Sequence, residues 1–247
     1  MSKLNITKND KYICFFARDS KYFDDYYHKI EMNAICPRDS NINVQLSALR
    51  FLVVNGYKCI RIGSAVTTEL EVYNEEKSKI IDYPNSMMQS EKLDLYIQSN
   101  PVFTISTGSG IELVSICFRN PVVLVNFVEI QNLHLYNNPF YELFIPKLLW
   151  SISEKRLLKF EEILKLDGNK VHTIEYFKKM NLEVIDNRED EIKNTIVEMY
   201  QRKEKKYIVN DEIEYYRTKI NKTINDATGN SHTSIGGYFA LKYKDLA

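Results

Sequence analysis

The sequence has no long hydrophobic run and no surplus of charge of either sign. Its longest apolar stretch, PVVLVNFV from Pro121, is far shorter than the roughly 18–20 residues that span a bilayer. Lysine plus arginine and aspartate plus glutamate number 33 each, so the formal net charge is zero. A general nucleic-acid binder usually carries a basic surplus, so this balance argues against nucleic acid as a partner.

Cysteine is scarce, and its spacing forms no motif. The four cysteines include no CxxC pair, and three of them lie in apolar runs. This pattern predicts free buried thiols in a reducing cytoplasm rather than disulfides or a zinc site. The N-terminus also lacks the apolar core and cleavage site of a signal peptide. We therefore expect a cytoplasmic protein, with a peripheral position at the inner face of the membrane left open.

Several familiar catalytic motifs are missing as well. The chain contains no Walker A loop and no GxGxxG fingerprint, which argues against an ATPase or a dehydrogenase. It contains no HExxH and no GxSxG elbow, and its histidines have no metal-ligand spacing. No DxD triplet occurs, so the divalent-metal site of metal-dependent sugar transferases is not evident, and no metal or separate cofactor is expected.

What the chain does contain is an alternation of short apolar runs with helical patterns over residues 1–130. Strands are expected in KYICFF, YKCIRIGS, KIIDYP, PVFTIST and PVVLVNF, and helices between them at 43–55, 90–99 and 111–119. Strand, helix and strand repeated in this way predict an α/β fold. Specifically, we expect a Rossmann-like, mostly parallel sheet with helices on both faces, which binds ligand at the edge where the strands end.

The pattern of apolar and polar residues changes over residues 131–247. We predict that this part is a helical C-terminal region packed on residues 1–130. An irregular aromatic loop is expected at 132–146. Further helices are expected at 153–164, 174–180 and 189–201, with a short strand in LEVID before the last of these. The tail from Asp211 reads as helical, followed by a turn and a final short helix.

The most informative segment is STGSGIELVSICF, in which a strand is followed by a glycine-rich turn and a helix. Gly108 and Gly110 flank Ser109. Glycine permits close approach of a ligand to the backbone, and the open amides of a helix start attract phosphate. The segment is equally compatible with a tight strand-to-helix turn that binds nothing.

Charged residues follow two of the expected strands and precede the first long helix. Arg18 and Asp19 come directly after the first strand, and Arg61 lies at the end of the second. Arg38 and Asp39 extend the pattern, although Asp39 or the following serine could simply cap the helix. An arginine at a strand end suits a bidentate phosphate contact because its planar fork matches two oxygens. A surface salt bridge is the alternative for Arg18 and Asp19.

The order of these segments resembles a family of bacterial glycosyltransferases of GT-B type, found with genes for surface polysaccharides. The matching pieces are FFARDSKYF, RDSNINVQLSALRFLVVNGYKCIRIGS, IIDYPNS, LDLYIQSNPVFTISTGSG, FRNPVVLVNF, LEVIDNREDEIKNTIVEMYQR and SIGGYFALKYKDL. They cover most of the chain in the expected order. The resemblance implies that the chain corresponds to the donor-binding half of such an enzyme, which holds a nucleotide-sugar.

Carried over position by position, the resemblance implicates six residues in donor binding. They are Arg18, Arg61, Gly108, Ser109, Gly110 and Asn126 at the end of the last strand. Arg18 is also similar to the arginine after the first strand in fucosyltransferase-like GT-B proteins, which implies that it supports the leaving diphosphate. An arginine in place of a metal would stabilise charge on that group, in keeping with the missing DxD triplet.

A complete GT-B enzyme has two such domains, and this chain resembles one. The acceptor half would come from a partner chain, from a second copy or from the region after residue 130. Asp19 and His28 stand in as candidates for the catalytic base. We expect transfer of a sugar to a surface-glycan or lipid-linked acceptor. The alternatives are a non-catalytic donor-binding subunit of a two-chain transferase and a sugar-nucleotide epimerase or hydrolase.

Overall fold

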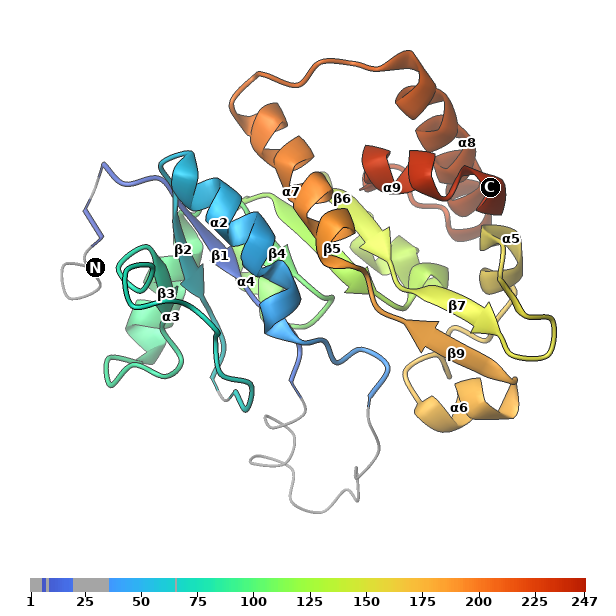
Figure 1. Ribbon diagram of the computed structural model, residues 1–247, viewed down its shortest axis with the longest axis horizontal. Coiled ribbons are helices and arrows are strands. Elements are labelled where there is room, and N and C mark those ends of the chain that lie inside the picture. Colours follow the sequence, from blue (N-terminus) through green and yellow to red (C-terminus); the bar gives the residue numbers. More distant parts are fainter. Residues whose placement is uncertain (1–5, 8, 20–35, 65) are drawn as a thin grey trace.

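The computed structural model in Figure 1 describes residues 6–7, 9–19, 36–64 and 66–247. Its centre is a seven-stranded sheet in which all neighbouring strands are parallel. The strands are β1 (Tyr12–Phe15), β2 (Lys58–Arg61), β3 (Ile80–Asp82), β4 (Thr104–Ser106), β5 (Val122–Phe127), β6 (Tyr141–Pro146) and β10 (Ser234–Ile235). Their order, β3-β2-β1-β4-β5-β6-β10, begins with the 3-2-1-4-5-6 arrangement of doubly wound dinucleotide-binding folds. The Rossmann-like α/β prediction is confirmed.

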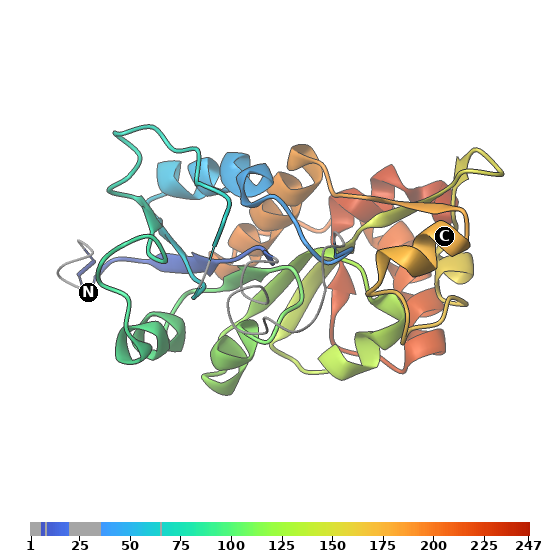
Figure 2. The same ribbon diagram turned by 90° about the horizontal axis from the view of Figure 1, so that it is seen from below.

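Helices cover both faces of the sheet (Figure 2). α2 (Leu46–Val54) and α7 (Glu189–Lys203) pack together on one face, and α3 (Glu91–Ser99) and α4 (Glu112–Cys117) lie on the other. Because both faces are covered, all six side chains of β5 are buried, as its continuous apolar run predicts. No helix in the described part of the chain is long and apolar enough to cross a membrane.

The caps of these helices agree with the sequence at one position and differ at another. Ser90 caps α3, since its hydroxyl accepts a hydrogen bond from the Leu93 amide. The short 3-10 helix η2 (Ile42–Gln45), which leads into α2, is capped by the Asn41 side chain rather than by Asp39 or Ser40. Asp39 therefore does not serve as the cap and lies near the ligand edge with Arg18.

The second part of the chain differs from its prediction in two places. The expected aromatic loop contains the 3-10 helix η3 (Ile130–Tyr136) and then β6, whose side chains are almost all buried against β5. The helix expected at 153–164 is wrong. The segment contains β8 (Arg156–Leu157) and the one-turn helix α5 (Phe160–Ile163). β8 pairs antiparallel with β7 (Leu148–Ser151), which pairs in turn with β9 (Leu182–Ile185) in a small separate sheet.

The remaining elements follow the prediction. α6 (Ile174–Lys179), β9, α7 and α8 (Asp211–Thr228) lie where helix, strand and helices are expected, and α9 (Gly237–Lys242) with the 3-10 turn η4 (Lys244–Leu246) ends the chain. β6 and β10 nevertheless belong to the central sheet, and one hydrophobic core runs from Ile13 to Ala240. The boundary placed at residue 130 thus crosses one sheet and one core.

All four cysteines are free thiols, as the sequence predicts. Cys14, Cys36 and Cys59 are buried, whereas Cys117 at the end of α4 is exposed. Burial raises the pKa of the Cys14 and Cys59 thiols far above the ordinary value. These two therefore act as small apolar core residues and not as reactive groups.

A reciprocal pair of asparagines joins the end of β5 to the segment between β9 and α7. The Asn126 amide donates to Asn187 Oδ1 at 2.6 Å, and the Asn187 amide donates to Asn126 Oδ1 at 2.5 Å. Asn187 Nδ2 also donates to the Pro146 carbonyl at 2.7 Å. Asn126 has a φ of 50°, a left-handed conformation that asparagine tolerates better than most residues. Both side chains are buried, so the pair satisfies backbone groups that water cannot reach.

Replacement of Asn187 by alanine should destabilise the protein without changing its fold. The Asn126 amide and the Pro146 carbonyl would each lose a buried partner, at about 1–3 kcal/mol per unsatisfied group. Urea denaturation should show this loss, while Asn169→Ala, at an exposed asparagine, should stay within about 0.5 kcal/mol of wild type. Equal stability of the two variants would contradict the role of the pair.

Candidate functional site

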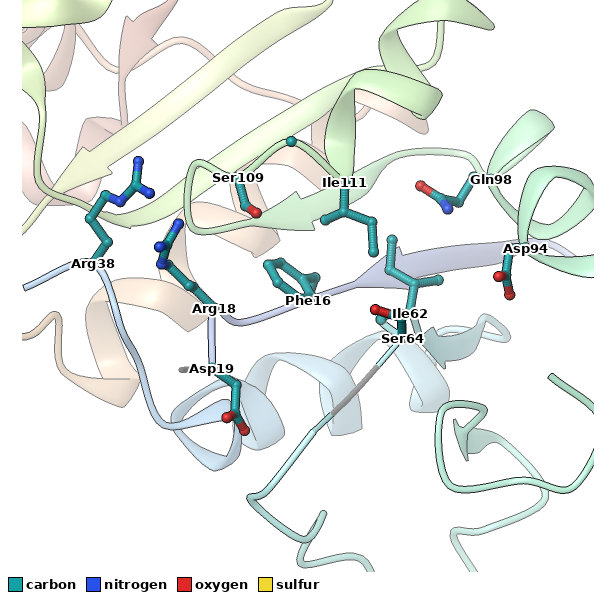
Figure 3. A pocket seen from close by; sticks show the side chains of 12 residues that line it. Phe16, Arg18, Asp19, Arg38, Ile62, Ser64, Asp94, Gln98, Ser109 and Ile111 are labelled. Atoms are coloured by element: carbon teal, nitrogen blue, oxygen red, sulfur yellow. The ribbon is translucent and has the colours of Figure 1, made fainter. Parts of the chain in front are cut away.

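A cavity of about 510 Å³ opens at the carboxyl edge of the sheet (Figure 3). It lies where β1 and β4 are neighbours but their outgoing connections pass to opposite faces, through α2 and α4 respectively. Open α/β sheets bind ligands in the crevice at this reversal of strand order. Its lining comes from the residues after β1, β2 and β4 and from α3. They are Phe16, Arg18, Asp19, Arg38, Ile62, Gly63, Ser64, Asp94, Gln98, Ser109, Gly110 and Ile111.

Two arginines lie side by side at one end of the cavity (Figure 3). Arg18 is held in the chain by its amide, which donates to Thr107 Oγ1 at 2.9 Å, and its Nε lies 3.5 Å from Asp39 Oδ1. Arg38 Nη1 donates to Glu129 Oε1 at 3.1 Å. Each guanidinium is thus oriented by an ion pair, Arg18 with Asp39 and Arg38 with Glu129, and both arginines line the cavity.

The surroundings of Arg18 disfavour the charge on its guanidinium. Burial lowers its pKa below the ordinary value, and the nearby Arg38 guanidinium lowers it further, while Asp39 and Glu129 oppose this. Two cations held together in a partly buried pocket gain most from an anion that both can contact. The arrangement therefore favours a di-anionic or phosphate-bearing group at this end of the cavity.

Arg61 differs from its expected role, because its side chain does not line the cavity. Only 2% of the residue is exposed, and its Nη1 donates to the Thr68 carbonyl at 2.9 Å and pairs with Asp82 Oδ1 at 3.4 Å. Side chains alternate along a strand: Ile60 and Ile62 face the small core beside the cavity, so Arg61 between them faces the other side. Phosphate binding by Arg61 is not supported by this geometry.

Asp19 lines the cavity but is already engaged with the loop that follows β2. Its Oδ2 accepts hydrogen bonds from the Thr67 amide at 2.7 Å, the Thr67 hydroxyl at 2.6 Å and the Thr68 amide at 3.3 Å. Because Arg61 holds the Thr68 carbonyl, the two residues fix one loop from two sides. Asp19 is thus a positioning residue for that loop. His28, the other candidate base, lies outside the described residues.

The glycine-serine turn is confirmed at the cavity, but an internal carboxylate occupies its amide. The Ser109 amide donates to both oxygens of Glu112, at 2.7 and 2.8 Å, and the Ser106 hydroxyl donates to Oε2 at 3.0 Å. Glu112 is the first residue of α4, and its carboxylate reaches back to the amide of the residue three positions earlier. The Ser109 side chain and Gly110 still line the cavity, so a ligand would meet the hydroxyl rather than an open helix start.

Gly108 and Asn126 support the site without lining it. Gly108 has a φ of 78°, and a Cβ there would lie 2.9 Å from Phe127 Cδ2, so no other residue fits this turn without strain. Asn126 Nδ2 donates to Ser40 Oγ at 2.7 Å, which anchors the segment that carries Arg38. Five of the predicted site residues line the cavity: Arg18, Asp19, Arg38, Ser109 and Gly110. The other three, Arg61, Gly108 and Asn126, are not part of its lining.

Sequence reasoning missed the residues that form the rest of the cavity. Phe16 and Ile62 could have been found by continuing the alternation of β1 and β2 by one step past each strand. Glu112 follows Ser109 with S-x-x-E spacing, and this spacing predicts a contact between the Glu112 carboxylate and the backbone at Ser109. Asp94 and Gln98 carry no sequence signal, because their place at the cavity depends on how α3 packs on the sheet.

No protein-family model, curated protein or solved structure matches the chain. The resemblance to bacterial glycosyltransferases therefore stays a prediction. Within the described residues, no three His, Cys, Asp or Glu side chains lie close enough to hold a metal ion.

Glu112 should make the protein less stable as pH rises towards neutrality. Burial raises its pKa from 4.5 to about 7. Below pH 4.5 the carboxyl is neutral in both states, whereas above pH 7 the folded protein bears the full cost of a buried charge. The difference corresponds to about 3 kcal/mol, at roughly 1.4 kcal/mol per pKa unit.

Glu112→Gln, which stays neutral, should remove most of this decline between pH 4.5 and pH 7 in urea denaturation measured across the pH range. The exposed-site control Glu161→Gln should retain the wild-type profile. A Glu112→Gln profile parallel to wild type would show that Glu112 does not titrate in this window.

Proposed function

We propose that the protein binds a nucleoside-diphosphate sugar in this cavity and transfers the sugar to a glycan or lipid-linked acceptor. The observation that carries the proposal is the paired Arg18 and Arg38 at one end of a cavity located at the strand-order reversal of a Rossmann-like sheet. That position is where such folds bind nucleotides, and the volume lies in the range of small-ligand sites. The resemblance noted in the sequence points to the same substrate class.

The two arginines suit the diphosphate of the donor. Arginine forms charge-assisted, bidentate hydrogen bonds with phosphate oxygens. When the bond between sugar and diphosphate breaks, negative charge grows on the leaving oxygen, and preoriented cations stabilise that charge more than they stabilise the ground state. Asp39 and Glu129 hold the guanidiniums in place before the ligand arrives. The Ser109 hydroxyl adds a donor near Arg18 in the lining of the cavity (Figure 3).

A second candidate function is that of a donor-binding subunit that needs another chain for catalysis. The described residues form one Rossmann-like sheet, and the other sheet has only three short strands. Asp19, the candidate base within reach of the cavity, accepts three hydrogen bonds from the loop at Thr67 and Thr68. A base held in this way is poorly placed to take a proton from an acceptor hydroxyl. A partner chain or a second copy would then supply the base and the acceptor site.

Removal of either cavity arginine should weaken binding of nucleoside diphosphates. For Arg38→Ala and for Arg18→Lys we expect about 10- to 100-fold weaker affinity by calorimetry, the loss of one or two charge-assisted bonds. Arg156→Ala is the matched control, because Arg156 pairs with Glu154 and Glu162 on the small sheet and does not line the cavity. Unchanged affinity in the cavity variants, or binding by no nucleoside diphosphate at all, would contradict the proposal.

A turnover assay separates the two candidate functions. A complete transferase consumes donor sugar when a glycan acceptor is added, whereas a donor-binding subunit binds the nucleotide and consumes nothing until its partner is present. Donor consumption in water alone would instead indicate a hydrolase or an epimerase on the same site.

A further inference from the structure

The end of the cavity away from the arginines is polar and carries no cation. Asp94 and Gln98, one helical turn apart on α3, line it, and the apolar side chains Phe16, Ile62 and Ile111 lie between the two ends (Figure 3). Residues four apart share one face of a helix, so both side chains can line the same end of the cavity. A ligand that matches both ends is anionic at one end, has apolar surface in the middle and carries hydrogen-bonding groups at the other.

Gln98 has a buried polar atom that lacks a partner. The residue is only 5% exposed, and its Oε1 makes no hydrogen bond within the described part of the chain. In Figure 3 its amide points towards the interior of the cavity. A buried acceptor without a partner costs free energy, and a ligand that donates to it would recover that cost.

We propose that Asp94 and Gln98 bind the base of the nucleotide and that this base is guanine. The proposal rests on the function proposed above and names its donor as a guanosine-diphosphate sugar. The hydrogen-bonding groups decide the choice of base. Asp94 Oδ1 accepts from the Tyr83 hydroxyl at 2.6 Å, which fixes the carboxylate and leaves Oδ2 to accept from a ligand. Gln98 adds an acceptor, Oε1, and the two N–H donors of its NH₂ group.

Guanine is the base whose edge matches these groups. Its N1–H and its exocyclic amino group are adjacent donors, and its O6 is an acceptor. Uracil offers one donor between two acceptors, and adenine and cytosine each offer one amino group beside ring acceptors. Guanine thus offers two adjacent donors to the acceptors of Asp94 and Gln98, whereas the matching edge of adenine, cytosine or uracil offers one. Phe16 and Ile111 supply apolar contacts for the flat faces of the ring.

The test is a switch of base preference. Xanthine carries an oxygen where guanine carries its amino group, so an amide at position 94 can donate to xanthine where a carboxylate cannot. We expect wild type to bind guanosine diphosphate about tenfold or more tightly than uridine, adenosine, cytidine or xanthosine diphosphate. In Asp94→Asn, affinity for guanosine diphosphate should fall about tenfold, and xanthosine diphosphate should become the preferred ligand.

The control is Tyr83→Phe, which removes the hydroxyl that orients Asp94. It should weaken binding of guanosine diphosphate without creating a preference for xanthine, because the carboxylate remains. A reversal of preference cannot come from a loss of folding, since one protein sample binds both ligands.

The outcomes separate this inference from the proposed function. If wild type prefers another base, or if Asp94→Asn leaves the ratio of guanosine to xanthosine affinities unchanged, the assignment of the base is overturned and the nucleotide-binding site stands. If none of the five nucleotides binds wild type, both are overturned.

Discussion

The structure depends on one constraint, the reversal of strand order between β1 and β4. Parallel strands need crossover connections, and right-handed crossovers place α2 on one face and α4 on the other. No connection can therefore cover the carboxyl ends of β1 and β4, where the cavity lies. The polar groups of the site stand at this uncovered edge because the strands themselves are buried on both faces. Arg18 and Ser109 are 91 positions apart in the sequence, yet the reversal brings them to one cavity.

The polar residues around the cavity differ in what they do. Arg18, Arg38, Asp94 and Gln98 line it. Asp19, which also lines it, and the buried Arg61 hold the loop after β2 from two sides. Asn126 and Asn187 tie the sheet to the segments behind the arginines. This division fits a site whose ligand-contacting groups are oriented before binding, so that little reorganisation is needed when the ligand arrives. The buried Glu112 and the unpartnered Gln98 oxygen cost stability, which is common where function constrains a fold.

The fold was predictable from the sequence because the first five strands are short apolar runs and three of the four connections between them carry a helix signal. β6 was missed, since Tyr141–Pro146 is flanked by asparagine and proline and its burial depends on pairing with β5. At the site, position after a strand identified Arg18 and Ser109, and the same rule failed for Arg61. A position just after a strand predicts that a residue lies at the carboxyl edge of the sheet, but not which face its side chain is on. The alternation of side chains along Ile60, Arg61 and Ile62 determines that face. Asp94 and Gln98 lie on a helix whose packing the sequence does not encode locally.

The most direct measurement of the central claim is a crystal structure of the protein with a nucleoside diphosphate bound. The account predicts the phosphates against Arg18 and Arg38, with the base between Phe16 and Ile111 and its polar edge at Asp94 and Gln98. A nucleotide located elsewhere on the molecule, or one whose phosphates lie away from both arginines, would contradict it.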